Sequence, residues 1–477
     1  MLSATGRCVG YPHPVIPERF RPAVAESAAL AERFVAAGRR IYLVGGSVRD
    51  AFVGRPDGSD ALDAGADIDL TTDARPDEIE QIVRGWADAV WLQGKEFGTI
   101  GCRHAGRRFE ITTHRAEAYT PDSRKPEVRF GDDVTADLAR RDFTVNAMAL
   151  ELPGLELYDP HGGLADLAAR RLRTPLDPDE SFSDDPLRML RAARFAAGYG
   201  LEPVPELVEA IGRLASRIAI VSPERVRDEL DKLVVVPSPD AGLWLVVRTG
   251  LAAHFLPELP ALALEQDPVH RHKDVLAHTI AVVAKTRPDR LLRLAALFHD
   301  VGKPRTRAFG PGGVSFHHHD VVGARMTRAR MEALRYSGED VAAVARLVEL
   351  HLRVHTYQLG WTDSALRRYA RDAGPLLGRL NELVRADCTT RDKQKAAALA
   401  RRIDELEERL ADLETREQLD AIRPELDGVE VMAELGLAPG REVGQALAFL
   451  LELRLEEGLL GKDVVRERLR TWWEQQH

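Results

Sequence analysis

Hydrophobic positions follow two different periods in the first third of the chain. Apolar residues recur at helical spacing over residues 23–37, where Gly38 ends the run, and again over residues 76–86. Short apolar or alternating runs at residues 41–44, 67–70, 98–101 and 108–113 predict strands. Predicted strands and helices therefore alternate along this part of the chain, which predicts an α/β domain.

After residue 166 the pattern is mostly helical, and downstream of Val236 a polar stretch rich in histidine appears at residues 267–273. A chain of 477 residues is long enough for several domains with their own cores. We therefore predict a multidomain protein with a loosely ordered lead-in at 1–22, an α/β head at 23–166, a helical neck at 167–265, a histidine-rich domain at 266–390 and a helical tail at 391–477.

Charge and cysteine usage narrow the picture. The chain has 66 Lys or Arg and 75 Asp or Glu, so its net charge of −9 offers no overall basic field to a polyanion. A local patch at residues 365–402, with ten basic and four acidic residues, suits phosphates, although a solvated helical face would look the same. Cys8, Cys102 and Cys388 lie far apart, as expected in a reducing cytoplasm. No apolar run approaches the ~20 residues of a membrane span, so we expect a cytoplasmic protein without membrane contact.

The strand at 41–44 runs directly into Gly45-Gly46-Ser47, and Arg49 follows in a segment with helical character. Glycine lets the backbone come close to a ligand, and such a turn points successive N–H groups and a helix N-terminus at it. The segment is therefore predicted to hold the phosphates of a nucleoside triphosphate.

The next predicted strand carries Asp67 and Asp69, which face the same way because side chains alternate along a strand. Two carboxylates on one face suit a pair of Mg²⁺ ions, one to activate a hydroxyl and one to neutralise a departing pyrophosphate. Glu110 lies where it would add a third carboxylate, and an ordinary surface glutamate would fit the same position.

Residues 43–50 and 67–70 together resemble the start of the nucleotidyltransferase superfamily, in the class that holds bacterial poly(A) polymerases and CCA-adding tRNA nucleotidyltransferases. Residues 140–149 match the second motif of that class almost residue for residue. By this resemblance Arg141 binds phosphate, which arginine can grip with two hydrogen bonds, and Asp142 binds ribose together with Asn146.

The helix that begins near Pro186 is predicted to select the base. Asp185 and Arg188 are three residues apart and share one helix face, and Arg191 follows on the same helix. A carboxylate accepts from an exocyclic amine and a guanidinium donates to the neighbouring ring nitrogen, an order that cytosine and adenine offer and that uracil and guanine reverse. The family has Glu where this chain has Asp184, which leaves the base-selecting pair unchanged.

Two further segments take their interpretation from the resemblance. Glu224 and Arg225, at the start of a helix capped by Ser222, are expected to brace the nucleotide-binding helix. Residues 115–135 show no period and are predicted to form a mobile loop, which in the family helps switch addition from C to A. Such a loop argues against an enzyme that adds C alone.

A second set of polar residues, His278, His299-Asp300 and Asp387, resembles the HD superfamily of metal-dependent phosphohydrolases. Imidazoles and carboxylates from separate helices can hold a divalent transition metal that polarises a phosphoryl oxygen and activates water. His319 and His351 would complete a second metal position or a substrate contact.

The tail has two features of its own. Residues 427–428 and 439–444 resemble the family's C-terminal RNA-binding segment. A heptad seam precedes them and predicts a helical hairpin or a contact between two copies of the chain. The seam residues are Leu399, Ile403, Leu406, Leu410 and Leu413.

Taken together, the resemblance implies a nucleotidyltransferase head, a base-selecting neck, an HD domain and an RNA-binding tail. The expected reaction is template-independent addition of CCA to the 3′ end of tRNA from CTP and ATP, with phosphohydrolase activity in the HD domain as a further expectation. Two alternatives remain open. A poly(A) polymerase would share the head motifs, and an HD phosphohydrolase would use the head only to hold RNA.

Overall fold

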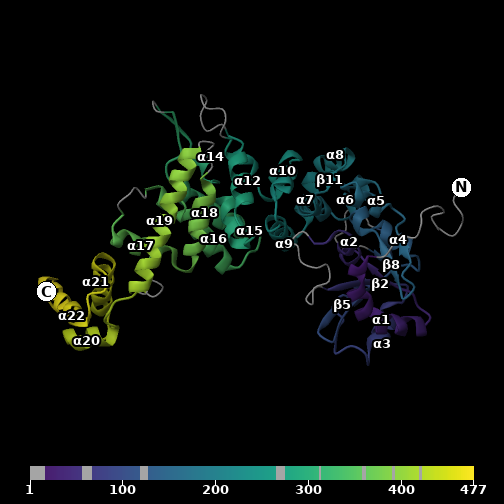
Figure 1. The fold of residues 1–477 in the computed structure, drawn as a ribbon, viewed down its shortest axis with the longest axis horizontal. Helices are drawn as coiled ribbons and strands as arrows, with labels where there is room; N and C mark the ends of the chain where they lie inside the picture. Colours follow the sequence, from purple (N-terminus) through teal and green to yellow (C-terminus); the bar gives the residue numbers. More distant parts are fainter. Residues whose placement is uncertain are drawn as a thin grey trace. The chain divides into compact units, whose positions relative to one another are not determined.

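The computed structural model describes residues 17–55, 67–118, 127–264, 274–310, 313–356, 361–388, 393–417 and 422–476 (Figure 1). The chain forms two compact units, Met1–Pro260 and Ala261–His477. The predicted head and neck lie in the first unit, and the predicted HD domain and tail lie in the second. Most of the predicted lead-in lies outside the described residues.

The head of the first unit is built on a mixed sheet, which has seven strands in the described part of the chain, in the order β3-β4-β5-β2-β1-β8-β9. The central strand β2 pairs in parallel with β5 and antiparallel with β1. The strands of this sheet are β1 (Ile41–Val44), β2 (Ile68–Thr72), β3 (Ala89–Trp91), β4 (Thr99–His104), β5 (Arg107–Thr113), β8 (Ala149–Leu152) and β9 (Leu157–Tyr158).

Burial on both faces of the sheet explains the continuous apolar run of β1, all four residues of which are buried. Tyr42 and Val44 pack in a cluster with Val134 and Leu138 of α4 (Val134–Ala139). Helices α1 (Arg21–Ala36) and α3 (Pro76–Val83) also pack against strands of the sheet (Figure 1). The predicted strands and both predicted helices of the head are therefore present, and a turn at Ala105-Gly106 joins β4 to β5.

The loop predicted over residues 115–135 is wrong at both ends. β6 (Arg115–Ala118) and β7 (Glu127–Phe130) form an antiparallel hairpin, with Arg115 opposite Phe130, and α4 begins at Val134. Backbone pairing between two short segments gives no apolar period, so the sequence pattern could not reveal it. Residues 119–126, between the two strands, lie outside the described residues.

Helices make up the rest of the first unit. Helix α7 packs against α9 and α10, which fixes its orientation. The helices here are α2 (Gly46–Val53), α5 (Gly163–Ala168), α6 (Pro178–Asp184), α7 (Leu187–Tyr199), α8 (Pro205–Leu214), α9 (Pro223–Val234), α10 (Asp240–Arg248) and α11 (Ala252–Phe255), with a short parallel pair formed by β10 (Arg171–Leu172) and β11 (Glu202–Pro203).

The described residues of the second unit are helical apart from the antiparallel pair β12 (Ala308–Gly310) and β13 (Gly313–Ser315). Helices α13, α15 and α16 pack together, and α18 joins α12 and α13. The helices are α12 (Val275–Lys285), α13 (Arg290–Phe298), α14 (Lys303–Thr306), α15 (His319–Ala333), α16 (Gly338–Leu350), α17 (Asp363–Ala373), α18 (Leu377–Asp387), α19 (Lys393–Glu417), α20 (Gly428–Leu435), α21 (Arg441–Glu457) and α22 (Lys462–Gln476).

The heptad seam lies on α19, the longest of these helices, and it packs within the chain. Ile403, Leu406, Leu410 and Leu413 are all buried, and α19 contacts α17 and α18. The side chain of Leu399 lies outside the described residues. The seam therefore matches the hairpin alternative, because the surface that a second copy would need is already covered.

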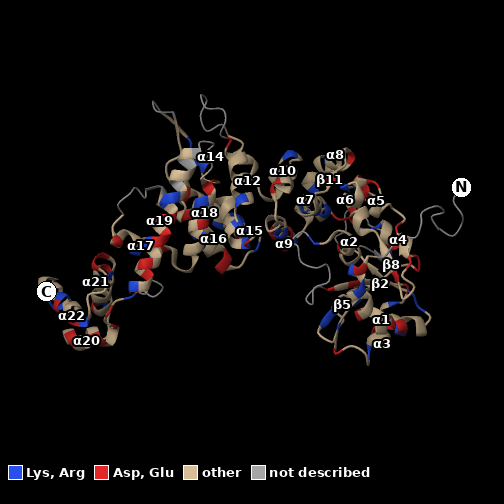
Figure 2. Ribbon diagram, viewed as in Figure 1, with Lys and Arg blue, Asp and Glu red and all other residues tan. Residues whose placement is uncertain are grey.

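Five of the ten basic residues predicted to form a patch at 365–402, the arginines of α17 and α18, form ion pairs inside the unit. Arg367 pairs with Glu417, Arg379 with Asp289, and the remaining arginines of α17 and α18 also meet carboxylates. Figure 2 shows basic and acidic residues interspersed along α17, α18 and α19. The prediction of a local phosphate-binding field is not supported for these arginines. The other pairs are Arg368 with Glu452 and Glu456, Arg371 with Asp372, and Arg385 with Asp404 and Glu407.

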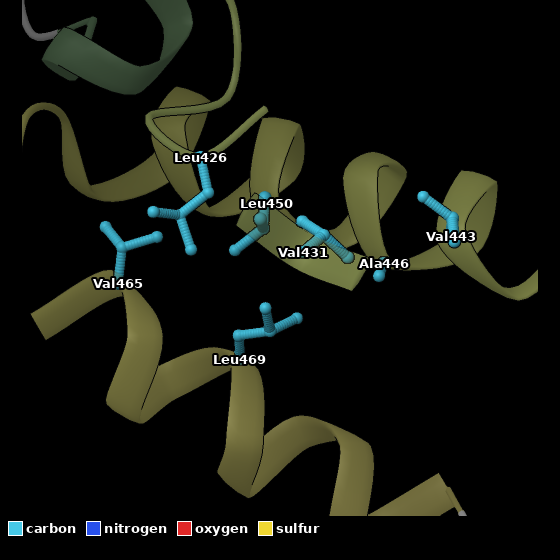
Figure 3. Close-up of a cluster of buried hydrophobic side chains, with 7 residues drawn as sticks. All are labelled: Leu426, Val431, Val443, Ala446, Leu450, Val465 and Leu469. Carbon is cyan, nitrogen blue, oxygen red and sulfur yellow. The ribbon is translucent and has the colours of Figure 1, made fainter. Parts of the chain in front are cut away.

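The last three helices of the tail share a small core of their own (Figure 3). Asp427 caps α20 by accepting from the N–H groups of Val429 and Glu430, while the Glu430 carboxylate accepts from the Asp427 N–H. Among the described residues no helix is both long and apolar enough to cross a membrane. The core consists of Leu426, Val431, Val443, Ala446, Leu450, Val465 and Leu469.

Candidate active site and metal centre

The turn between β1 and α2 can be built only with glycine at its first position. Gly45 has φ of +65° and ψ of −130°, and a Cβ there would lie 3.2 Å from the Arg141 guanidinium. Gly46 opens α2, and the Ser47 hydroxyl lies 3.5 Å from the Asp69 amide. The predicted phosphate cradle is therefore a left-handed glycine at a helix start, beside Arg141 and Asp69.

The predicted carboxylates gather at the start of β2, next to the middle of β5. Asp69 lies directly opposite Glu110 in the parallel register, and Asp67 immediately precedes β2. Arg108 bridges the outer pair, 3.8 Å from the Asp67 carboxylate and 3.3 Å from the Glu110 carboxylate. Burial raises the pKa of Asp69 to about 6, with Glu110 and Asp67 adding to the rise and Arg141 opposing it. A cation at this place would relieve the crowding of negative charge.

A cavity of about 320 Å³ opens beside these carboxylates. Its polar lining consists of six arginines and four carboxylates, an excess of positive charge that suits a polyphosphate. Ser47, Arg49, Asn146, Glu224 and Asp67 do not line it. The charged residues around the cavity are Asp69, Glu110, Arg115, Arg140, Arg141, Asp142, Asp185, Arg188, Arg191 and Arg225.

Asp142 is held in this cavity by Asn146, with which it was predicted to act, and by Arg191, whose contact with it was not predicted. Arg191 Nε donates to the Asp142 carboxylate at 2.8 Å, and Asn146 Nδ2 donates to its other oxygen at 2.9 Å. Burial opposes ionisation of Asp142, but Arg191 and Asn146 outweigh it and hold the pKa of this carboxyl well below its usual range. Asn146 also accepts from Arg49 Nη1 at 2.6 Å, so Arg49 acts from behind the cavity.

Asp137 is a site residue that the sequence interpretation missed. Its fully buried carboxylate on α4 accepts from Arg140 Nε and from Arg141 Nη2, both at 3.2 Å. Burial works against its ionisation, and the two arginines hold its pKa below the usual range. The spacing of three and four residues between Asp137 and the arginine pair is the signal that would have found it.

The predicted base-selecting pair lies in the same cavity with its orientation fixed. Asp185 accepts from the Leu187 amide at 3.1 Å and from Arg225 Nη2 at 2.8 Å. Arg188 Nη1 donates to the Ser181 hydroxyl at 2.8 Å, and Nη2 donates to the Arg140 carbonyl. Both side chains are thus held by neighbours before any nucleotide binds.

The bracing of α7 by α9 differs from the expectation in one residue. Arg225 does brace the site, through Asp185. Glu224 is exposed and forms no hydrogen bond or ion pair within the described chain, whereas Glu229, one turn further on and buried, pairs with Arg194 of α7. A buried glutamate on the apolar face of a helix was the sequence signal for this partner.

In the second unit, six predicted residues from the ends and starts of five helices converge. His278 of α12, His299 at the end of α13 and Asp387 at the end of α18 place ligand atoms within 4.8 Å of one another. Asp300, His319 and His351 form a second such group. All except His278 and Asp387 are buried, so the two groups form one dense polar cluster inside an apolar helical core.

Backbone carbonyls orient three of the four imidazoles. His299, His319 and His351 each place Nδ1 2.6–2.8 Å from a carbonyl oxygen three residues earlier, and a carbonyl can only accept, so Nδ1 carries the proton. Their Nε2 atoms therefore turn inward. Within the described chain the Nε2 atoms of His319 and His351 and the Oδ1 atom of Asp300 have no hydrogen-bond partner, although all three are buried. Buried nitrogen and oxygen atoms whose lone pairs have no hydrogen-bond partner are typical of metal ligands. In a metal-binding histidine the other ring nitrogen usually donates to a carbonyl or carboxylate, as Nδ1 does here.

The protonation pattern agrees with this interpretation. Burial lowers the pKa of His351 to about 4 and also lowers that of His319, which keeps both rings neutral. Burial also opposes a charge on His299, but Asp300 and Asp387 outweigh it and raise its pKa to about 10. Lys303, which the sequence interpretation had not singled out, reaches Asp300 at 2.7 Å. A proton on His299 thus supplies part of the positive charge that the cluster requires.

Comparison with known families assigns the same regions. The model described as "Poly A polymerase head domain" matches residues 41–173, the one described as "Probable RNA and SrmB- binding site of polymerase A" matches residues 200–262, and the HD domain model matches residues 275–412. Nucleotidyltransferase and HD domains use divalent metals, in agreement with the clusters described above.

Two relatives cover most of the chain. It is 40% identical over 333 residues to the A-adding tRNA nucleotidyltransferase of Deinococcus radiodurans, covering 67% of this chain and 74% of that protein. It is 39% identical over 352 residues to the CC-adding tRNA nucleotidyltransferase of Thermus thermophilus, covering 70% of this chain and 77% of that protein. The CCA-adding enzyme of Bacillus velezensis is 38% identical over 228 residues, 48% of this chain and 53% of that protein.

The fold agrees with solved structures. The Bacillus stearothermophilus CCA-adding enzyme in complex with CTP superposes with a TM-score of 0.66 and 23% identity, over 95% of this chain and 99% of that one. Its identity to this chain is low enough that the match speaks for the fold alone. The head motifs, the matched domains and the two long relatives confirm the expected family, and the chain belongs to the tRNA nucleotidyltransferases.

Proposed function

We propose that the protein adds CCA to the 3′ end of tRNA, using CTP and ATP and releasing pyrophosphate. The observation that carries this proposal is the single cavity in which groups for three tasks meet: Asp69 and Glu110 for catalysis, Arg141 for phosphate, and Asp185 with Arg188 for the base. Relatives with these names add A, CC or CCA, which supports tRNA as the substrate.

In the proposed reaction the 3′ hydroxyl of tRNA attacks the α-phosphate of the bound nucleotide. Arg141, fixed by Asp137, would bind the triphosphate beside the Gly45 turn, where backbone N–H groups also face it. Asp142, kept ionised by Arg191, would accept from a ribose hydroxyl. Asp67, Asp69 and Glu110 fit Mg²⁺, whose charge would activate the hydroxyl and stabilise the leaving pyrophosphate.

Base selection follows from two fixed donors and acceptors. The Leu187 amide and Arg225 each donate one hydrogen bond to Asp185, and a carboxylate can accept about four, so capacity remains for an exocyclic amine. Arg188 can donate to the adjacent ring nitrogen. Cytosine and adenine satisfy both groups. Uracil and guanine would leave the half-buried carboxylate facing a carbonyl oxygen, a mismatch that costs about 1 kcal/mol or more.

The test is extension of a tRNA transcript that lacks its 3′ CCA, with Mg²⁺ and each nucleotide alone or CTP with ATP, followed by sequencing of the 3′ end. Growth by C, C and A that then stops supports the proposal. Arrest after CC, or addition of A only to a transcript that already ends in CC, would make it a partial enzyme. Long A tracts with ATP alone would make it a poly(A) polymerase.

We further propose that the HD domain is a metal-dependent phosphohydrolase. The supporting observation is the set of buried and orphaned ligand atoms on Asp300, His319 and His351, next to the group formed by His278, His299 and Asp387. Imidazole-rich sites favour transition metals over Mg²⁺, and such an ion would polarise a phosphoryl oxygen and activate water. Release of p-nitrophenol from bis-p-nitrophenyl phosphate, measured with Ni²⁺, Mn²⁺ or Mg²⁺ after chelation, tests this activity. No release with any of these metals would argue against it.

A further inference from the structure

A second polar cavity lies in the first unit and shares no lining residue with the nucleotide cavity. It has a volume of about 360 Å³ and lies between α2, the C-terminal half of α7 and the end of α9. Four of its side chains are cationic and one is acidic. The charged residues are Arg49, Arg55, Arg194 and Lys232, with Asp50 as the single carboxylate.

Two of these cations are satisfied by the protein and two are not. Arg49 pairs with Asp50 at 2.6 Å, and Arg194 pairs with Glu229, which lies outside the cavity lining. The side chains of Arg55 and Lys232 form no ion pair or hydrogen bond with any described residue. Among the described residues nothing neutralises these two positive charges at the wall of the cavity, which predicts an anionic ligand.

The cavity suits a phosphate group better than a base. Tyr199 is the aromatic residue among its lining side chains, and its ring is already stacked on Phe195 and lies 4.2 Å from the Arg49 guanidinium. The Tyr199 hydroxyl is also engaged, since it donates to Asp50 at 2.9 Å. Without a free aromatic face, the cavity lacks the stacking platform that single-stranded bases use.

Hydrogen bonds connect this cavity with the nucleotide cavity. Arg49 Nη1 donates to Asn146, and Asn146 donates to Asp142, the residue assigned to ribose, which lines the nucleotide cavity. Arg49 therefore lines the second cavity and also hydrogen-bonds Asn146, the residue that holds Asp142 in the nucleotide cavity. An anion bound here would meet a group that also positions the active site.

We propose that this cavity binds a backbone phosphate of the tRNA substrate. The inference rests on the proposed function, which supplies tRNA as the ligand. One wall of the cavity, Lys232 and residues 235–237, lies within the segment matched by the family model described as an RNA and SrmB-binding site. A phosphodiester needs point charges without base contacts, and Arg55 and Lys232 offer them.

The test removes the two unpaired charges and leaves every described ion pair in place. Arg55→Gln/Lys232→Gln is compared with Arg103→Gln/Arg248→Gln, a charge-matched control in which both side chains are exposed, form no ion pair with a described residue and lie outside both cavities. Binding of labelled tRNA lacking CCA is measured by filter retention across a salt series. CTP binding without tRNA, and kcat and KM for CTP, are measured in parallel.

We expect the cavity variant to bind tRNA about tenfold more weakly at low salt and to lower the slope of log Kd against log salt by about 1, whereas the control does neither. CTP binding and kcat should not change. If CTP binding falls while tRNA binding holds, the ligand is the phosphate of a free nucleotide, and the backbone assignment is overturned. Equal behaviour of the two variants overturns the site altogether.

The wild-type protein separates this inference from the function on which it rests. Failure of the unaltered chain to bind or extend tRNA would refute the proposed function and the inference together. Normal extension by the wild type, combined with unchanged tRNA binding by Arg55→Gln/Lys232→Gln, refutes the inference alone.

Discussion

Replacing Asp69 with Asn should stabilise the metal-free head and abolish nucleotidyl transfer. Burial raises the pKa of Asp69 from 3.8 to about 6 in the folded protein. A carboxyl with a raised folded-state pKa contributes stability that is complete below its unfolded pKa and is lost as the pH rises through the folded value. A difference of about two pKa units corresponds to about 3 kcal/mol at pH 8 and to less than about 1 kcal/mol at pH 4. Asn stays neutral and avoids this loss.

Hydrogen exchange of the β1 and β2 backbone amides, in the full chain with EDTA, measures the local stability concerned, because each peptide reports the opening of its own part of the sheet. The advantage of Asp69→Asn should grow between pH 4 and pH 8. Asp67→Asn is the matched control, since the Asp67 side chain is 44% exposed and should gain less. Mg²⁺ should protect the wild type more than Asp69→Asn. An advantage that does not change with pH, or none at pH 8, would refute the argument that ionised Asp69 is the strained group.

Three further outcomes test other parts of the structure. Arg225→Ala removes a hydrogen bond to one oxygen of Asp185 and should raise kcat/KM for UTP relative to CTP about tenfold. The control Arg227→Ala, on the same helix, should leave this ratio unchanged. An unchanged ratio in Arg225→Ala would show that Arg225 does not orient Asp185 and Arg188. Asp300→Asn should abolish metal-dependent hydrolysis of bis-p-nitrophenyl phosphate and leave CTP addition to tRNA unchanged, and loss of both activities would contradict two separate sites. Because the pKa of His299 is raised to about 10, transition-metal binding to the HD site at pH 7.5 should release about one proton. Calorimetry in buffers of different ionisation enthalpy measures the number of protons released. The same number in His299→Ala would show that the proton comes from another group.

Residues joined by short sequence spacing or by strand alternation were predictable. Asp67 and Asp69 follow from the period of two in a strand, and Gly45 is needed because the turn has a positive φ. The HD residues were predictable as a set because their order in the chain resembles that of the HD superfamily. Their convergence in space was not predictable, because they lie at the ends and starts of five helices that are far apart in the sequence.

The partners that failed prediction are separated by long stretches of chain. Glu229 lies 35 residues from Arg194, and Glu417 lies 50 residues from Arg367. A local count of charge at 365–402 could not include such partners, so it predicted a free basic patch where the fold contains ion pairs. Glu224 was predicted from the resemblance because it belongs to the recognisable helix start, whereas the buried contact is made by Glu229, further along the same helix.

The two proposed metal sites differ in the ligand atoms that they offer, and this difference predicts that they bind different ions. The head offers oxygen ligands only, and its Arg108 and Arg141 stay close to the carboxylates, so a hard and weakly held ion such as Mg²⁺ fits. The HD cluster buries imidazoles whose Nδ1 protons are fixed by backbone carbonyls, which turns basic nitrogen atoms inward and favours a transition metal. The head site offers oxygen ligands and the HD site offers mainly nitrogen ligands. Each site can therefore select a different ion from the same mixture of metals.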